Sequence, residues 1–131
     1  MKSTPCLDYV IPVGGLQYKL IIVRMAFEKG ELPESVLDLF QDYYTAYIGV
    51  KSGHPWHSMS YTDIENRSVG FTFSDDKIYN VSSAGDGWWF IGWDYASSSG
   101  WDRSGFEVFC DVESVLREAV NDNRKNQRSE Q

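Results

Sequence analysis

The sequence is poor in cysteine and has no long apolar run. Its two cysteines, Cys6 and Cys110, are too few in 131 residues for a fold held together by disulfides. No stretch approaches the roughly 20 consecutive apolar residues that cross a bilayer. Residues 1–6 also lack the hydrophobic core of a signal peptide. These absences predict a cytoplasmic protein without membrane contact, whose stability comes from buried apolar side chains.

Positive charge is also scarce. The chain has 12 Lys and Arg against 19 Asp and Glu, a net charge of -7, and its last eleven residues hold three cations and two anions, which leaves -8 on residues 1–120. Affinity for nucleic acid comes largely from cationic side chains that release counterions, so direct binding to nucleic acid is disfavoured. An acidic surface suits a protein partner with a basic surface. An equal alternative is that the charge only keeps the protein soluble.

The apolar residues fall into short runs separated by turn residues, which is typical of strands. Residues 7–13 and 18–25 flank Gly14 and Gly15, whose freedom to adopt positive φ predicts a tight β-hairpin. The other predicted strands are residues 47–50, 69–73, 78–81, 88–93 and 106–110. With 42% hydrophobic and 15% aromatic residues, the chain can build one core but not two.

Two helices are predicted beside these strands. Pro33 suits the first turn of one, because its missing N–H is not needed there. The apolar residues that follow Pro33 at helical spacing are Val36, Leu37, Phe40, Tyr43, Tyr44 and Tyr47. Asp111 is the predicted N-cap of the other helix, which ends near residue 121. The predicted fold is α+β: an antiparallel sheet of about five to seven strands packed with two α-helices, in a single domain of residues 1–122 with a flexible tail at 123–131.

Two histidines are the first candidates for chemistry. His54 and His57 lie three residues apart and could bind a metal with Asp63 or Asp94. Pro55 between them disfavours the regular helix that would place both rings on one face. A structural zinc site also usually needs more cysteine or histidine ligands nearby. We therefore interpret both residues as ordinary loop histidines.

Other catalytic patterns are incomplete. The serines at 97–99 lack both a nucleophile-elbow motif and a marked base. The carboxylates Asp86, Asp94 and Asp102 could serve glycoside hydrolysis, which usually needs a deep cleft on a larger scaffold. No glycine-rich loop suited to phosphate is present. The sequence predicts no catalysis, no cofactor and no metal site, with a metal-dependent hydrolase built on His54, His57 and Asp94 as the enzyme alternative.

The aromatic stretch at 88–102 is the strongest candidate for binding. Strand alternation places Trp88, Phe90 and Gly92 on one face and the intervening Trp89, Ile91 and Trp93 on the other. One face must pack on the helices, and the second is either exposed for a partner or covered, for example by loop 51–63. The predicted binding residues are Trp56, Asp75, Asp76, Asp86, Trp88, Trp89, Trp93, Asp94, Tyr95, Trp101 and Asp102.

Four blocks of the sequence resemble a family of small phage and mobile-element proteins. The blocks are YIGVKSGHPW at 47–56, YTDI at 61–64, GFTF at 70–73 and WWFIGWDYA at 88–96, against GYVGVPKGHPxYG, HGGLTF and WWFGFDxAHxGD in the family. His54 and Asp94 match the family pattern, whereas Ser68 and Ser97 stand where it has histidine. The resemblance covers residues 47–120. It implies either a relative that only binds or a motif that is structural throughout.

Together these observations predict a non-catalytic binding protein. The resemblance implies a phage-type inhibitor of a host or defence protein, similar to an anti-CRISPR protein, acting in the host cytoplasm. Such a protein would cover a basic groove on its target with acidic residues and aromatic anchors. One alternative is a small-ligand protein that binds a nucleotide or sugar in a tryptophan-lined pocket. Another is a toxin-immunity protein, whose partner would be its cognate toxin.

Overall fold

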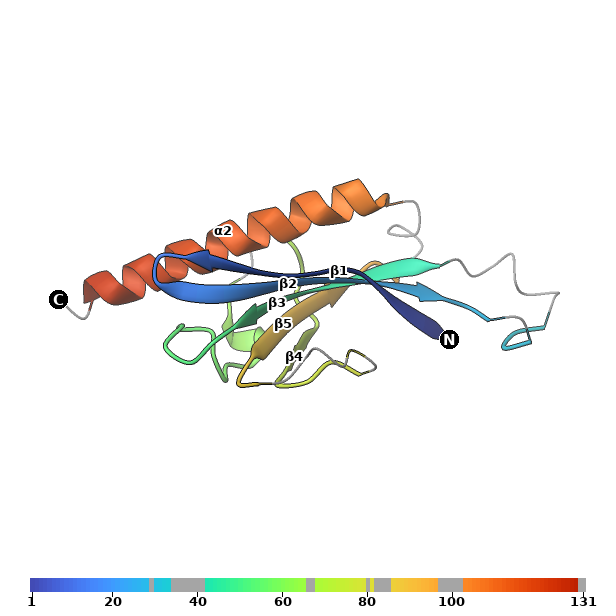
Figure 1. Cartoon of the computed structure of the whole chain (residues 1–131), viewed down its shortest axis with the longest axis horizontal. Coiled ribbons are helices and arrows are strands. Elements are labelled where there is room, and N and C mark those ends of the chain that lie inside the picture. The colour runs from blue at the N-terminus through green and yellow to red at the C-terminus, as the bar shows by residue number, and fades with distance from the viewer. Residues whose placement is uncertain are drawn as a thin grey trace.

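In the part of the chain that the structure describes, a five-stranded antiparallel sheet carries one long helix over one of its faces (Figure 1). The computed structural model describes residues 1–28, 30–33, 42–65, 68–79, 81, 86–96 and 103–129. The strands are β1 (Lys2–Val13), β2 (Leu16–Ala26), β3 (Tyr43–Val50), β4 (Phe73–Asp75) and β5 (Trp89–Asp94), in the spatial order β1-β2-β3-β5-β4. The predicted α+β class and antiparallel sheet are confirmed. Within the described residues there is one α-helix, α2 (Gly105–Ser129), and not two.

The predicted hairpin is confirmed. Gly14 and Gly15 have φ of 61° and 85°, and the flanking residues Val13 and Leu16 pair across the turn. Positive φ at both central positions is the mark of the turn whose twist matches that of the two strands. β1 begins earlier than predicted, at Lys2, and its pairing with β2 shifts register between Pro5 and Leu7.

The prediction of the first helix is wrong for its last residues, which form part of β3. Tyr43, Tyr44 and Tyr47 belong to a strand that pairs with β2 on one side and β5 on the other, and residues 34–41 lie outside the described part of the chain. A central strand with both faces covered carries apolar side chains at nearly every position, so a helical spacing can be picked out of it. The tyrosines and Thr45 also favour a pleated surface.

α2 begins six residues before its predicted cap. Ser104 is the N-cap, because its Oγ accepts the Glu107 N–H at 3.1 Å and its carbonyl accepts the Val108 N–H at 3.1 Å. The predicted strand 106–110 is therefore the first part of the helix, and Asp111 lies inside it. The Ser-x-x-Glu pattern at 104–107 is a capping box, which accounts for this start. Residues 123–129, predicted to belong to the flexible tail, form the last turns of α2, and Asn123 is buried.

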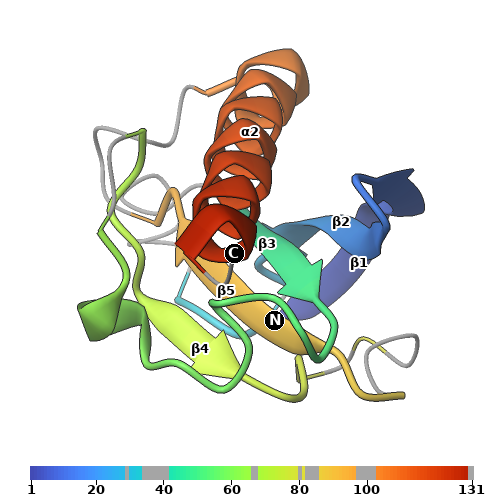
Figure 2. The ribbon, with the colours of Figure 1, turned by 90° about the vertical axis from the view of Figure 1, so that its left-hand side faces the viewer.

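The two faces of the sheet are covered to different extents. α2 lies over one face of the sheet (Figure 2). Its buried stripe of Val108, Val112, Val115 and Ala119 belongs to the core on that side. The side chains that cluster on the other face are Ile21, Val23, Ile78, Val81, Trp88 and Phe90.

The chain between β3 and β5 is less regular than predicted. Loop 51–63 is confirmed, with one short 3-10 helix at Tyr61–Asp63. Of the predicted strand 69–73 only Phe73 is in β4, which continues into the predicted turn at 74–77. Residues 78, 79 and 81 form no strand. In the described part of the chain no helix is long and apolar enough to cross a membrane.

Candidate functional site

The tryptophans of residues 88–93 lie in the core or pack against it. Trp88 and Trp93, on opposite faces, are only 6% and 3% exposed. Trp89 is partly buried, and its indole N–H donates to the Met59 carbonyl at 2.9 Å. Loop 51–63 packs on the α2 side with Trp89 and Trp93, whereas Trp88 packs on the other face with Ile78 and Val81. Both faces of this stretch are thus covered, the second by Ile78 and Val81 and not by the predicted loop, and its aromatic richness belongs largely to the fold. Trp101 and Asp102 lie outside the described residues.

His54 and Trp56 fasten loop 51–63 to α2. The Nδ1 atom of His54 accepts the Trp56 backbone N–H at 3.0 Å, so Nε2 carries the proton and donates to the Ala119 carbonyl at 2.8 Å. The indole N–H of Trp56 donates to Asp122 Oδ2 at 3.0 Å. Burial lowers the pKa of His54 and favours the neutral ring that this arrangement requires. Both nitrogens of His54 are thus engaged in holding the loop.

His57 points elsewhere. Its Nε2 lies 3.2 Å from the carbonyl oxygen of Gly87, and its Nδ1 lies 3.0 Å from Ser58 Oγ. The two histidines therefore contact backbone carbonyls in different segments, Ala119 of α2 and Gly87 before β5. The structure does not bring them together as a pair of metal ligands.

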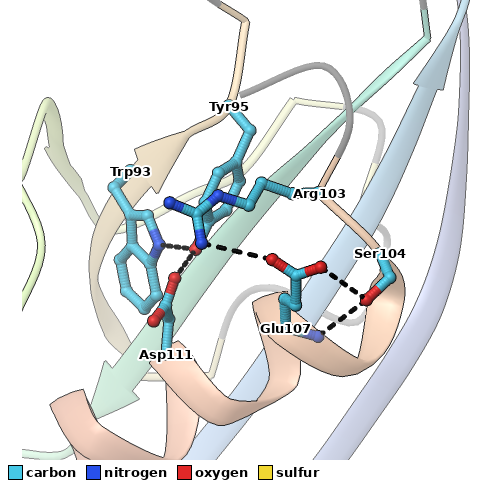
Figure 3. Close-up of polar contacts among 6 residues, drawn as sticks. All are labelled: Trp93, Tyr95, Arg103, Ser104, Glu107 and Asp111. Atoms are coloured by element: carbon cyan, nitrogen blue, oxygen red, sulfur yellow. Dashed lines mark hydrogen bonds and ion pairs between the residues drawn. The ribbon is translucent and has the colours of Figure 1, made fainter. Parts of the chain in front are cut away.

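Tyr95 joins the end of β5 to α2 (Figure 3). Its hydroxyl accepts the Trp93 indole N–H at 3.0 Å and donates to Asp111 Oδ2 at 2.6 Å. Burial raises the pKa of Tyr95, and the bond to Asp111 acts in the same direction. Asp111, predicted to cap the helix, instead anchors it to the sheet. Tyr95 is buried, so its position indicates a structural role.

An apolar groove lies on the face of the sheet that α2 does not cover. A cavity of about 230 Å³ between Met25, Tyr47, Phe73 and Tyr79 adjoins one of about 210 Å³ that reaches Asp94. The two share Thr45, Tyr47 and Phe73, so they form one continuous depression, the open-face groove. A concave apolar surface with a few polar groups is the usual form of a binding site.

Gly92 gives the groove its shape. It pairs with Tyr47 across β3 and β5, and a Cβ placed on it would lie 2.5 Å from Tyr47 Cδ1. The tyrosine ring thus lies over the glycine and meets Phe73 edge-on, with ring centroids 5.4 Å apart. The sequence pattern that could have predicted this side of the groove is the alternation Tyr43-x-Thr45-x-Tyr47. It has the period of a strand and places the odd-numbered residues on one face.

The polar end of the groove is formed by Asp94. It pairs in register with Thr45, and its Oδ2 lies 3.4 Å from Thr72 Oγ1. Burial raises the pKa of Tyr43 and Tyr47, and the negative charge of Asp94 adds to this in both. Both phenols therefore stay protonated beside an exposed carboxylate. This end can accept a cation or hydrogen-bond donors, while its walls accept an apolar stem.

The remaining predicted acids are exposed. Asp75 and Asp76 lie between Phe73 and Ile78, two residues that line the groove. Hydrogen bonds with Asp76 lower the pKa of Asp75, which favours its ionised form. Asp86 lies in the turn before β5, where its carbonyl accepts a hydrogen bond from Lys51.

Tyr79, which sequence reasoning assigned to a strand, is 89% exposed and lines the groove. Of the predicted binding residues that are described, Trp93 and Asp94 line this groove, with Asp75 and Asp76 beside it. Comparison of the chain with protein-family models, curated proteins and solved structures finds no match.

Proposed function

We propose that this protein is a non-catalytic binding protein that holds a basic segment of a partner protein in the open-face groove. The observation that carries the proposal is the position of Tyr79. A tyrosine exposed over nearly its whole surface lies at an apolar groove whose other end carries the Asp94 carboxylate. Aromatic side chains of this kind frequently dominate the energy of protein interfaces.

The groove suits a lysine or arginine side chain flanked by an apolar residue. An aliphatic stem can lie against Tyr47 and Phe73 while the charged head reaches Asp94. Asp75 and Asp76 add negative charge beside the groove. The net charge of -7 would draw a basic surface toward the protein before contact is made.

A protein that covers a basic surface can block whatever nucleic acid that surface binds. We therefore propose that the protein acts as an inhibitor of a host or defence protein in the host cytoplasm. Its acidity and the phage-like blocks of its sequence support this role. A toxin with a basic active-site groove is the corresponding partner in the immunity-protein alternative.

Binding of basic peptides tests the proposal. A fluorescent Lys/Leu peptide and its Glu/Leu counterpart are titrated with the full chain and followed by anisotropy. We expect saturable binding of the basic peptide alone, weakened at least tenfold (about 1.4 kcal/mol) by Asp94→Asn and by Tyr79→Ser. Asp63→Asn is the matched control, because it removes the same charge beside α2, where Asp63 lines a different cavity with Asp122.

Two outcomes would contradict the proposal. The first is equal loss of binding in the Asp63 and Asp94 variants, which would indicate unspecific attraction to an acidic body. The second is binding that stays constant as salt rises from about 0.1 to about 0.5 M, since exposed charge pairs weaken under that screening. The inhibitor role is tested by a pull-down from cells that carry a defence nuclease, repeated with the Asp94 variant.

A further inference from the structure

β1 forms one edge of the sheet, and on its outer side it has no neighbour among the described residues (Figure 2). It is 12 residues long and carries two exposed apolar side chains, Tyr9 at 56% and Val10 at 40%. A long edge strand offers unpaired backbone groups that another strand can bind. Pro5 and Pro12 have no N–H, so a continuous row of backbone donors and acceptors is present only between them.

The hairpin determines which backbone groups point outward. A two-residue turn with positive φ at both glycines makes Val13 and Leu16 a hydrogen-bonded pair. Backbone direction alternates along an antiparallel strand, so Ile11 and Tyr9 also point toward β2. Val10 therefore directs its N–H and C=O away from the sheet, at the middle of the exposed stretch.

α2 is left uncovered along the same edge. A cavity of about 360 Å³ lies between its flank and the end of β1, lined by Val13, Leu116 and Val120. Phe109, 40% exposed, lies two helical turns before Leu116 on the same flank. A sixth strand added beside β1 would lie beneath this flank and bury it.

The occupant that fits best is a second copy of this chain. An added strand must present apolar residues at alternate positions to reach the flank of α2. β1 itself does so: Leu7, Ile11 and Val13 all pack into the α2-side core, and Tyr9 shares their face. A two-fold axis perpendicular to the sheet keeps that face beneath the helices.

The charges along this edge agree with self-association. The rim of the cavity carries Glu113, Arg117 and Arg124, and Arg117 pairs with Glu113 one turn away on α2. In a two-fold arrangement the glutamate of one copy can also meet an arginine of the other. The excess of negative charge lies elsewhere on the molecule, and a basic partner would gain nothing at this rim.

We propose that two copies associate through their β1 edges around Val10, with the α2 helices side by side above the junction. The open-face groove reaches Met1 and Ser3, at the start of β1 and far from Val10, and stays open in both copies. The dimer would then present two grooves on one side, which raises the avidity for a partner with repeated basic segments. The dimer itself does not depend on the proposed function.

Sedimentation equilibrium of the full chain over a concentration series tests this proposal. We expect a monomer–dimer equilibrium whose association weakens at least tenfold on Val10→Pro, which removes the outward N–H. Phe109→Asp should have the same effect by placing a charge at the junction. Tyr79→Ser is the control: it removes an exposed aromatic residue from the opposite face and should leave the equilibrium unchanged.

A monomer at every concentration overturns the proposal. So does a dimer that both substitutions leave intact, because the contact would then lie on another surface. Far-UV circular dichroism shows whether each variant folds, and if Val10→Pro does not, Phe109→Asp on the helix decides alone. Peptide binding to the groove by a strictly monomeric protein would refute the dimer and leave the proposed function standing.

Discussion

The ring of Tyr47 occupies the space that a side chain on Gly92 would need. The two residues face each other across β3 and β5, and a Cβ on Gly92 would lie 2.5 Å from Cδ1 and 2.8 Å from Cε1 of the tyrosine. The ring is itself held by an edge-on contact with Phe73. The shape of the groove floor therefore depends on the absence of a Cβ atom at Gly92.

Gly92→Ala should push the Tyr47 ring into the groove and strain the sheet. Overpacking of this kind costs roughly 1–3 kcal/mol, measured as the change in free energy of unfolding in urea. Gly70→Ala is the matched control, since a Cβ there meets nothing within 4 Å. Equal stability of the two variants would show that the ring moves aside freely. The same variant should also weaken binding of the basic peptide.

The free energy of unfolding should decrease as the pH is lowered, because His54 becomes protonated. Burial lowers the pKa of His54 in the folded protein below its ordinary value of 6.5. The unfolded chain therefore takes up the proton first, and the contribution of the neutral ring is present above about pH 6.5 and lost as pH falls further. His54→Gln cannot titrate, so its free energy of unfolding should decrease less between pH 7.5 and pH 5. Parallel curves for the two proteins would contradict this.

Tyr95→Phe should destabilise the junction between β5 and α2. The change leaves the Asp111 carboxylate and the Trp93 indole without the hydroxyl that now lies 2.6 and 3.0 Å from them. Loss of such a partner in a buried place costs about 1–3 kcal/mol. Tyr79→Phe removes an exposed hydroxyl and should change thermal stability by less than about 0.5 kcal/mol. A similar effect in both variants would refute the assigned role of Tyr95.

Ser104→Ala should shorten or weaken α2 at its start. It removes the oxygen that accepts the Glu107 N–H, at a cost of about 1 kcal/mol. Ser114 lies within the helix, and its hydroxyl donates to the Cys110 carbonyl one turn back, so Ser114→Ala should be neutral or stabilising. Circular dichroism in a urea titration compares the two. If Ser114→Ala were the costlier change, Ser104 would not be the cap.

Parts of the fold that depend on neighbouring residues could be predicted from the sequence. Gly14 and Gly15 indicate their turn by themselves, and the strand character of residues 88–93 follows from their apolar and β-forming side chains. The capping box at Ser104 and Glu107 is also visible in the sequence. Asp111 is an equally good cap by residue type, so a choice between the two requires the tertiary structure. Tyr43 and Tyr47 fit two periods at once, and only the pairing of β3 with β2 and β5 selects the strand.

The sequence by itself determined the general properties of the protein: an apolar core, an acidic surface, a hairpin and an antiparallel sheet. These follow from composition, turn chemistry and side-chain period, which are local properties. Only the tertiary structure decided that Trp88 and Trp93 are buried, that His54 hydrogen-bonds to α2, and that Tyr47, Tyr79 and Asp94 share one groove. Burial and groove geometry are set by contacts between segments distant in the chain, and no local pattern encodes them.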